Sequence, residues 1–112
     1  MILAIVGSRT FSDYELMKSE LKRFKDISMI VSGGAIGADS LAERYSKENN
    51  IPIKIIKPNW KLGKHAGFLR NDTIAHESDE IIAFWDGISK GTQNTINTGI
   101  RQGKKVAIIE VR

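Results

Sequence analysis

Two short runs of glycine and polar residues stand directly after apolar segments of the chain and could bind an anion. The first is Gly7-Ser8-Arg9, after residues 2–6, and the second is SGGAIGAD at residues 32–39, after residues 29–31. Glycine lets bare backbone amides approach an anion, whose charge is stabilised further by the positive end of a following helix. Arginine could form a forked pair with a phosphate. A phosphate site is one interpretation of these runs, and a tight packing turn for the second run and a surface salt bridge for Arg9 are equally open.

The second run offers Ser32, Gly33, Gly34, Gly37 and Asp39 as candidate ligand-binding residues. It matches neither the P-loop pattern, which needs Lys followed by Ser or Thr, nor the dinucleotide fingerprint with its spaced glycines. Asp39 has a second interpretation, because an acid in the first turn of a helix is favourable with the helix dipole whether or not it touches a ligand.

A third run, DGISKGT at residues 86–92, follows the apolar residues 80–85. Ser89, Thr92 and the amides around Gly91 could form a second anion-binding nest at the start of a helix. Thr92 is also a plausible plain N-cap, and Asp86 with Gly87 is a common turn pair, so both structural interpretations stay open.

Three further candidates lie between residues 58 and 71. Trp60 follows Pro58, and its ring could stack on a base, while Arg70 and Asn71 offer a cation and an amide. His65 and His76 lack the carboxylate or histidine spacing of a metal site, and the chain has no cysteine, so neither a metal nor a cofactor is predicted.

The elements that must position these residues follow a regular alternation. Apolar segments at residues 2–6, 29–31, 53–56, 80–85 and 106–109 begin about 25 residues apart, the length of a strand plus a crossover helix. Helical periodicity lies between them, with Ser12 and Glu15 predicting a capping box and Gly103 a helix C-cap. Strands that are apolar throughout predict an α/β fold, a doubly wound five-stranded parallel sheet with helices on both faces.

Such a sheet binds ligands beyond the carboxyl ends of its strands, where the strand order reverses. Eight of the ten glycines fall in the loops after strands, on this expected ligand side, whereas Gly99 and Gly103 suit helix packing and a helix end. The 112 residues are expected to form a single domain, 1–112.

Composition excludes several classes of protein. A hydrophobic content of 41% is enough for a core and argues against disorder, and the absence of cysteine removes disulfide scaffolds and thiolate chemistry. No apolar run approaches the ~18 residues of a membrane span, so a soluble, cytoplasmic protein is expected. The net charge of +4 suits an anionic ligand, but the basic residues form no stripe typical of a nucleic-acid binder.

Four motifs together resemble the YspA-like branch of the SLOG superfamily, named for the Smf/DprA and LOG proteins. They are GSRTFSD, VSGGAIGAD, PNWKLGKHAGFLRN and AFWDGISKGT, in this order along nearly the whole chain. The resemblance implies a Rossmann-like domain that binds nucleotides or nucleotide-derived molecules. Related domains are phosphoribohydrolases, single-stranded DNA binders, or sensors of signals such as cyclic ADP-ribose derivatives.

The binding pattern of the family carries over better than its catalytic pattern. The LOG enzymes have a glutamate three residues after their glycine-threonine pair, and Thr95 stands there in this sequence. Asp39 and Asp86 are the remaining candidates for a catalytic acid or base. The positions that match the family motifs are Gly7, Ser8, Arg9, Gly33, Gly34, Gly37, Asp39, Trp60, Arg70, Asn71, Asp86, Ser89, Gly91 and Thr92.

Three functions follow, in order of preference. The first is a sensor, carrier or sequestering protein that binds a nucleotide-derived small molecule. The second is a nucleotide N-glycosidic hydrolase, and the third is a DprA-like binder of single-stranded nucleic acid. A homodimer is expected by analogy with the family, and no membrane partner is expected.

Overall fold

The computed structural model describes residues 1–111, and its centre is a sheet of five parallel strands in the order β3-β2-β1-β4-β5. The strands are β1 (Ile2–Gly7), β2 (Met29–Ser32), β3 (Ile53–Ile55), β4 (Glu80–Trp85) and β5 (Lys105–Glu110). All four neighbouring pairs are parallel. The five-stranded parallel sheet predicted from the apolar segments is confirmed.

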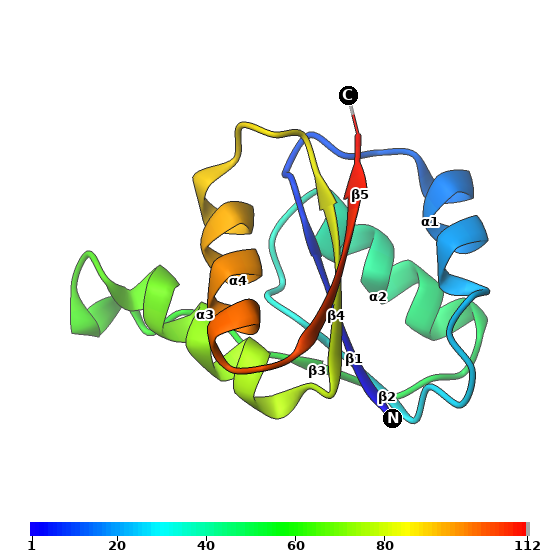
Figure 1. The fold of residues 1–112 in the computed structure, drawn as a ribbon, viewed down its shortest axis with the longest axis horizontal. Coiled ribbons are helices and arrows are strands. Elements are labelled where there is room, and N and C mark those ends of the chain that lie inside the picture. The colour runs from blue at the N-terminus through cyan, green and yellow to red at the C-terminus, as the bar shows by residue number, and fades with distance from the viewer. Residues whose placement is uncertain (112) are drawn as a thin grey trace.

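Helices cover both faces of the sheet, as Figure 1 shows. On one face α1 (Tyr14–Leu21) and α2 (Ala38–Glu48) bury a core that includes Leu3, Met17 and Phe84. On the other face α3 (Ala66–Glu77) and α4 (Lys90–Arg101) bury a second core that includes Val31 and Ile74. A short 3-10 helix, η1 (Trp60–Leu62), precedes α3. This two-faced covering explains why the central strands are apolar throughout.

The helix ends confirm one prediction and correct another. Gly103 directly follows the C-cap residue of α4 and has φ +75°, a left-handed conformation that glycine adopts without strain. The capping box expected from Ser12 and Glu15 is wrong. The N-cap of α1 is Asp13, whose carboxylate accepts a hydrogen bond from the Leu16 N–H at 3.0 Å, so the helix starts one residue later than that motif requires.

The chain reverses its direction across the sheet between β3 and β4. It builds outward from β1 to β2 and β3, then crosses to the other side of β1 to add β4 and β5. The loops after β1 and β4 therefore diverge, and this point of divergence is where doubly wound sheets open a crevice. No helix among residues 1–111 is long and apolar enough to cross a membrane.

Candidate functional site

A cleft of about 110 Å³ opens at this point, beyond the carboxyl ends of the central strands. It brings together nine of the residues predicted from the sequence, which come from four separate segments of the chain. They are Gly7, Arg9, Gly33, Asp39, Arg70, Asn71, Ser89, Gly91 and Thr92. Val6, Ala35, Ile74 and Thr95 complete the lining.

Two arginines supply the positive charge of the cleft. Arg9 is exposed on the loop after β1, whereas Arg70 is half-buried on α3. The Arg70 guanidinium donates to the Gly33 carbonyl oxygen and to the Asn71 Oδ1, each at 3.0 Å. Burial and the nearby charge of Arg9 lower the pKa of Arg70. Two cations converging on one small cleft are stabilised when an anion binds between them.

Gly33 gives Arg70 the room it occupies. A Cβ at this position would lie 2.6 Å from the Arg70 Nη1 and 3.1 Å from the Asp39 Oδ2. The guanidinium and the carboxylate thus flank the same backbone atom, although the two groups make no ion pair within 4.0 Å among the described residues. A glycine is required here by close approach rather than by an unusual φ.

Gly37 is a glycine for a different reason. It has φ +80°, and a Cβ there would lie 2.4 Å from the Arg9 carbonyl oxygen and 2.5 Å from the Ser8 carbonyl oxygen. The start of α2 packs directly on the loop after β1, and the Ala38 N–H donates to the Ser8 carbonyl oxygen at 3.2 Å. This amide is therefore held by the protein itself and does not face a ligand.

Asp39 is the carboxylate of the cleft. Its side chain is buried, and its Oδ2 accepts a hydrogen bond from the Ala35 N–H at 3.1 Å. Burial raises the pKa of Asp39, and the Ala35 hydrogen bond and the charge of Arg70 offset part of this rise. The acid thus orders the turn before α2 and also lines the cleft, and its contact with a ligand stays a prediction.

The start of α4 forms another wall. The Ser89 Oγ accepts from the Thr92 N–H at 3.4 Å and lies 3.1 Å from the Thr92 Oγ1. Within residues 1–111, the Gly91 N–H has no acceptor, as expected for the second residue of a helix. One amide at a helix N-terminus is therefore available to an anion in the cleft.

Asp86 lies outside the cleft lining. Its Oδ1 accepts hydrogen bonds from the Ile88 N–H at 2.9 Å and the Ser89 N–H at 2.8 Å. These bonds lower the pKa of Asp86. The carboxylate bonds to the Ile88 and Ser89 amides of its own turn and not to the Gly91 amide of the predicted nest, so the turn interpretation describes Asp86.

Asn71 joins α3 to α4 at the floor of the cleft. Its buried side-chain amide donates to the Asn94 Oδ1 at 2.9 Å and to the Gly91 carbonyl oxygen at 3.4 Å. The Thr95 Oγ1 donates to the same carbonyl oxygen at 3.1 Å. Thr95, which the family resemblance places where LOG enzymes carry their glutamate, also lines the cleft.

The other predicted residues are placed elsewhere. Trp60 is 67% exposed on η1, in the segment that extends away from the sheet in Figure 1, and does not line the cleft. The Ser8 Oγ accepts from the Asp86 N–H at 3.1 Å, and the Ser32 Oγ from the Gly34 N–H at 3.5 Å, so both serines order the loops behind the cleft.

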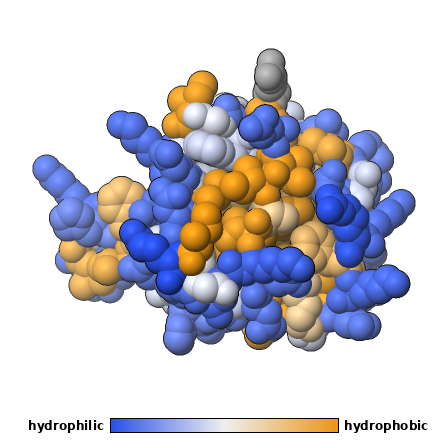
Figure 2. Space-filling view, in the orientation of Figure 1, coloured by the Kyte–Doolittle hydropathy of each residue, from blue (hydrophilic) through white to orange (hydrophobic). Residues whose placement is uncertain are grey.

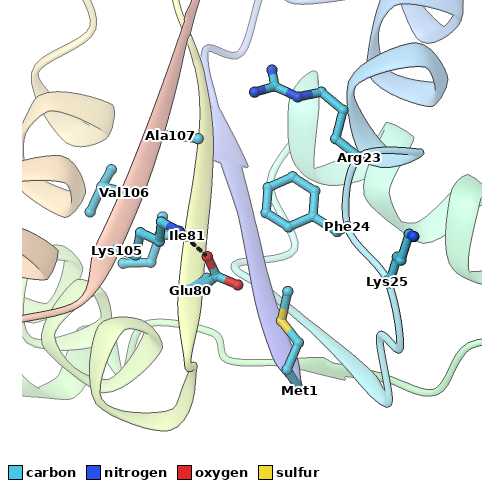
Figure 3. A pocket seen from close by; sticks show the side chains of 9 residues that line it. All are labelled: Met1, Arg23, Phe24, Lys25, Glu80, Ile81, Lys105, Val106 and Ala107. Carbon is cyan, nitrogen blue, oxygen red and sulfur yellow. Dashed lines mark ion pairs between the residues drawn. The ribbon is translucent and has the colours of Figure 1, made fainter.

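A second hollow, of about 370 Å³, lies at the opposite end of the sheet. It is formed by Met1, Phe24 and Ala107 with charged residues around them, as Figure 3 shows. Glu80 and Lys105, the first residues of β4 and β5, form an ion pair there at 4.0 Å. The amino ends of parallel strands are not where ligands of doubly wound sheets bind, so this larger hollow is not the candidate site.

The strand order and the cleft at the point of reversal define a Rossmann-like α/β domain. Residues 1–63 match the model of the YspA, cpYpsA-related SLOG family. The chain is also 31% identical to the Gene 61 protein of Mycobacterium phage D29 over 110 aligned residues, which cover 88% of each chain. The chain belongs to the YspA, cpYpsA-related SLOG family. This membership indicates nucleotide-related binding.

Proposed function

We propose that this protein binds a nucleotide or nucleotide-derived small molecule by a phosphate group held in the cleft, as a sensor, carrier or sequestering protein. The observation that supports it best is that Arg9, Arg70 and Gly91 line one cleft and that the Gly91 amide has no acceptor among residues 1–111. Each of these groups is a donor, and together they reach the cleft from the loop after β1, from α3 and from α4. A phosphate oxygen could accept from all three.

The volume of the cleft indicates which part of a ligand would fit inside it. A volume of 110 Å³ is far below the roughly 300–1,000 Å³ of pockets that enclose a whole small molecule. The cleft suits one charged group with part of a sugar, and the rest of the ligand lies on the rim. Ile36 and Ile88, which are 68% and 81% exposed in the turns after β2 and β4, offer apolar surface for a base there.

Titration calorimetry against inorganic phosphate, AMP, ADP-ribose, cyclic ADP-ribose and NAD tests this proposal. We expect a nucleotide of the panel to bind, and Arg9→Ala to weaken its binding by about 10- to 150-fold, the equivalent of one hydrogen bond to a charged group. Arg9 is exposed, so its loss should leave the fold intact. Arg23→Ala, at an exposed arginine paired with Glu20, is the matched control. No binding across the panel, or equal effects of the two variants, would contradict the proposal.

A second candidate function is cleavage of the N-glycosidic bond of a nucleotide, and the observation that favours it is Asp39. Its buried carboxyl faces the cleft and has a raised pKa, which suits a general acid. Release of free base from AMP, measured by chromatography and abolished in Asp39→Asn, would support hydrolysis. Tight binding of AMP with no base released at high enzyme concentration would exclude hydrolysis and leave binding as the function.

Binding of single-stranded nucleic acid is separated from both by its salt dependence. Phosphate contacts along a strand release counterions, so affinity for an oligonucleotide would fall steeply between low and moderate salt. We expect the oligonucleotide to bind much more weakly than the best mononucleotide, because the cleft has room for a single phosphate.

A further inference from the structure

Among residues 1–111, the outer edge of β5 carries backbone groups without partners. Within residues 1–111 this strand pairs only with β4. The Val111 N–H donates to the Trp85 carbonyl oxygen at 2.9 Å, so the backbone groups of Ile109 and Ala107 also face β4. Because backbone groups alternate along a strand, those of Val106, Ile108 and Glu110 point away from the sheet. A six-residue edge with free donors and acceptors is a template for another strand.

Apolar side chains flank this edge on the α4 face of the sheet. Ile108 is 44% exposed on β5, and Ile100 is 59% exposed on α4. Two residues of α4, Asn94 and Gln102, form hydrogen bonds with α3. Gly99 lies against the sheet, because a Cβ added there would contact Ile81. Helical periodicity then puts Ile100 on the side of α4 that faces away from α3, beside β5.

The opposite face of β5 is only partly covered by the described residues, with Ala107 and Ile109 half-buried. The hollow drawn in Figure 3 lies there, with Phe24 on one wall and Ala107 on the other. Figure 2 shows apolar surface gathered over this part of the molecule, bordered by hydrophilic side chains. An apolar edge open on both faces is the pattern of an interface rather than of a solvated strand.

We infer that β5 pairs antiparallel with β5 of a second copy of this chain across a two-fold axis, which joins the two sheets into one of ten strands. A two-fold interface needs a surface that is complementary to itself. With Ala107 on the axis, Val106 lies opposite Ile108 of the second copy, and Lys104 lies opposite Glu110. Val106 and Ile108 then meet each other across the axis and Lys104 meets a carboxylate, while Lys105 lies opposite Ile109 on the other face of the strand.

The backbone fits this register. Val106 and Ile108 are the residues whose amides point outward, and directly opposite residues of that kind exchange two hydrogen bonds in an antiparallel pair. Ala107, on the axis, forms the closer pair without hydrogen bonds, where a small side chain is accommodated. The Lys104 ammonium already contacts the Ser78 carbonyl oxygen at 2.8 Å and has further donors for a carboxylate.

Light scattering coupled to size exclusion, over a wide range of protein concentration, tests this inference on the full chain. We expect a mass of twice 12.5 kDa, and Ile108→Lys should return it to 12.5 kDa. Ile36→Lys is the matched control. Ile36 is more exposed than Ile108, and it follows β2, which β1 and β4 separate from β5. Circular dichroism shows that each variant is folded.

A charge exchange identifies the register. Glu110→Lys sets lysine against lysine in a homodimer, and Lys104→Glu sets acid against acid, so each variant alone should dimerise less than the native chain. Mixed together, the two variants restore both pairs and should form a heterodimer. A monomer at every concentration, a dimer that Ile108→Lys leaves intact, or failure of the mixture to associate would overturn the inference. Nucleotide binding is measured separately, so failure here leaves the proposed function standing.

Discussion

Replacing Gly33 by alanine tests whether Arg70 is held in the position that ligand binding needs. The added Cβ would lie 2.6 Å from the Arg70 Nη1 and 3.1 Å from its Cζ. Gly33 does not have a positive φ, so alanine adds no backbone strain. The whole effect of the substitution is therefore the displacement of the guanidinium and of the Asp39 carboxylate beside it.

The magnitude follows from what the displaced arginine loses. Its bond to the Gly33 carbonyl oxygen is charge-assisted, and a hydrogen bond to a charged group contributes about 1.5–3 kcal/mol. Overpacking at a well-filled site costs about 1–3 kcal/mol of stability. If the same guanidinium binds the phosphate, its loss weakens affinity by about 10- to 150-fold.

The assay is calorimetric titration of the best nucleotide of the panel, with urea unfolding of the same samples. Gly67→Ala is the matched control, because a Cβ there meets nothing within 4 Å. We expect the Gly33 variant to lose both affinity and stability and the Gly67 variant to lose neither. Native affinity in Gly33→Ala would refute the assignment of Arg70 to the ligand.

Three further predictions concern the loops around the cleft. Folding raises the pKa of Asp39 above its ordinary 3.8, so the native chain should lose stability as the pH rises through the raised value. Urea unfolding at a series of pH values should show this loss in the native chain and not in Asp39→Asn. Stability profiles against pH that run parallel in the two proteins would contradict this. Asp86→Ala frees the Ile88 and Ser89 amides and should lower the thermal midpoint, whereas Asp86→Asn should largely preserve it. Gly37→Ala combines φ +80° with a backbone clash and should cost about 3 kcal/mol or more in urea unfolding, while Gly63→Ala, at φ +88° but in open space, should cost less.

The sheet could be predicted from the sequence because its strands are marked by continuous apolar segments. The strands at residues 2–6 and 80–85 are largely buried, and no other element of an α/β domain has that pattern at such regular spacing. Glycine placement then indicated which end of the sheet would carry a cleft. Each of these signals lies in a short stretch of sequence. The parallel sheet then brings the loops after its strands together at one end.

The arrangement of side chains in the cleft was less predictable, because it depends on helix rotation and turn geometry. Asp86 and Thr92 stand in one short run, yet the carboxylate bonds to its own turn and only Thr92 lines the cleft. On α3 the apolar Leu69 is 47% exposed, while the polar Asn71 is buried. Asn71 can be buried because its amide donates a hydrogen bond to Asn94 on α4. The sequence alone does not show that these two residues meet.

The cleft and the β5 edge are separate surfaces that share one helix. Gly91 of α4 lines the cleft, and Ile100 of the same helix flanks the edge. A two-fold axis perpendicular to the sheet runs the strands of the two copies in opposite directions, so their clefts open at opposite ends of the joined sheet. One ligand could not bridge them. Helix α4 and the β1-β4-β5 part of the sheet both connect the two surfaces, and because coupling is reciprocal, a ligand that alters pairing would have its own affinity altered by pairing by the same factor.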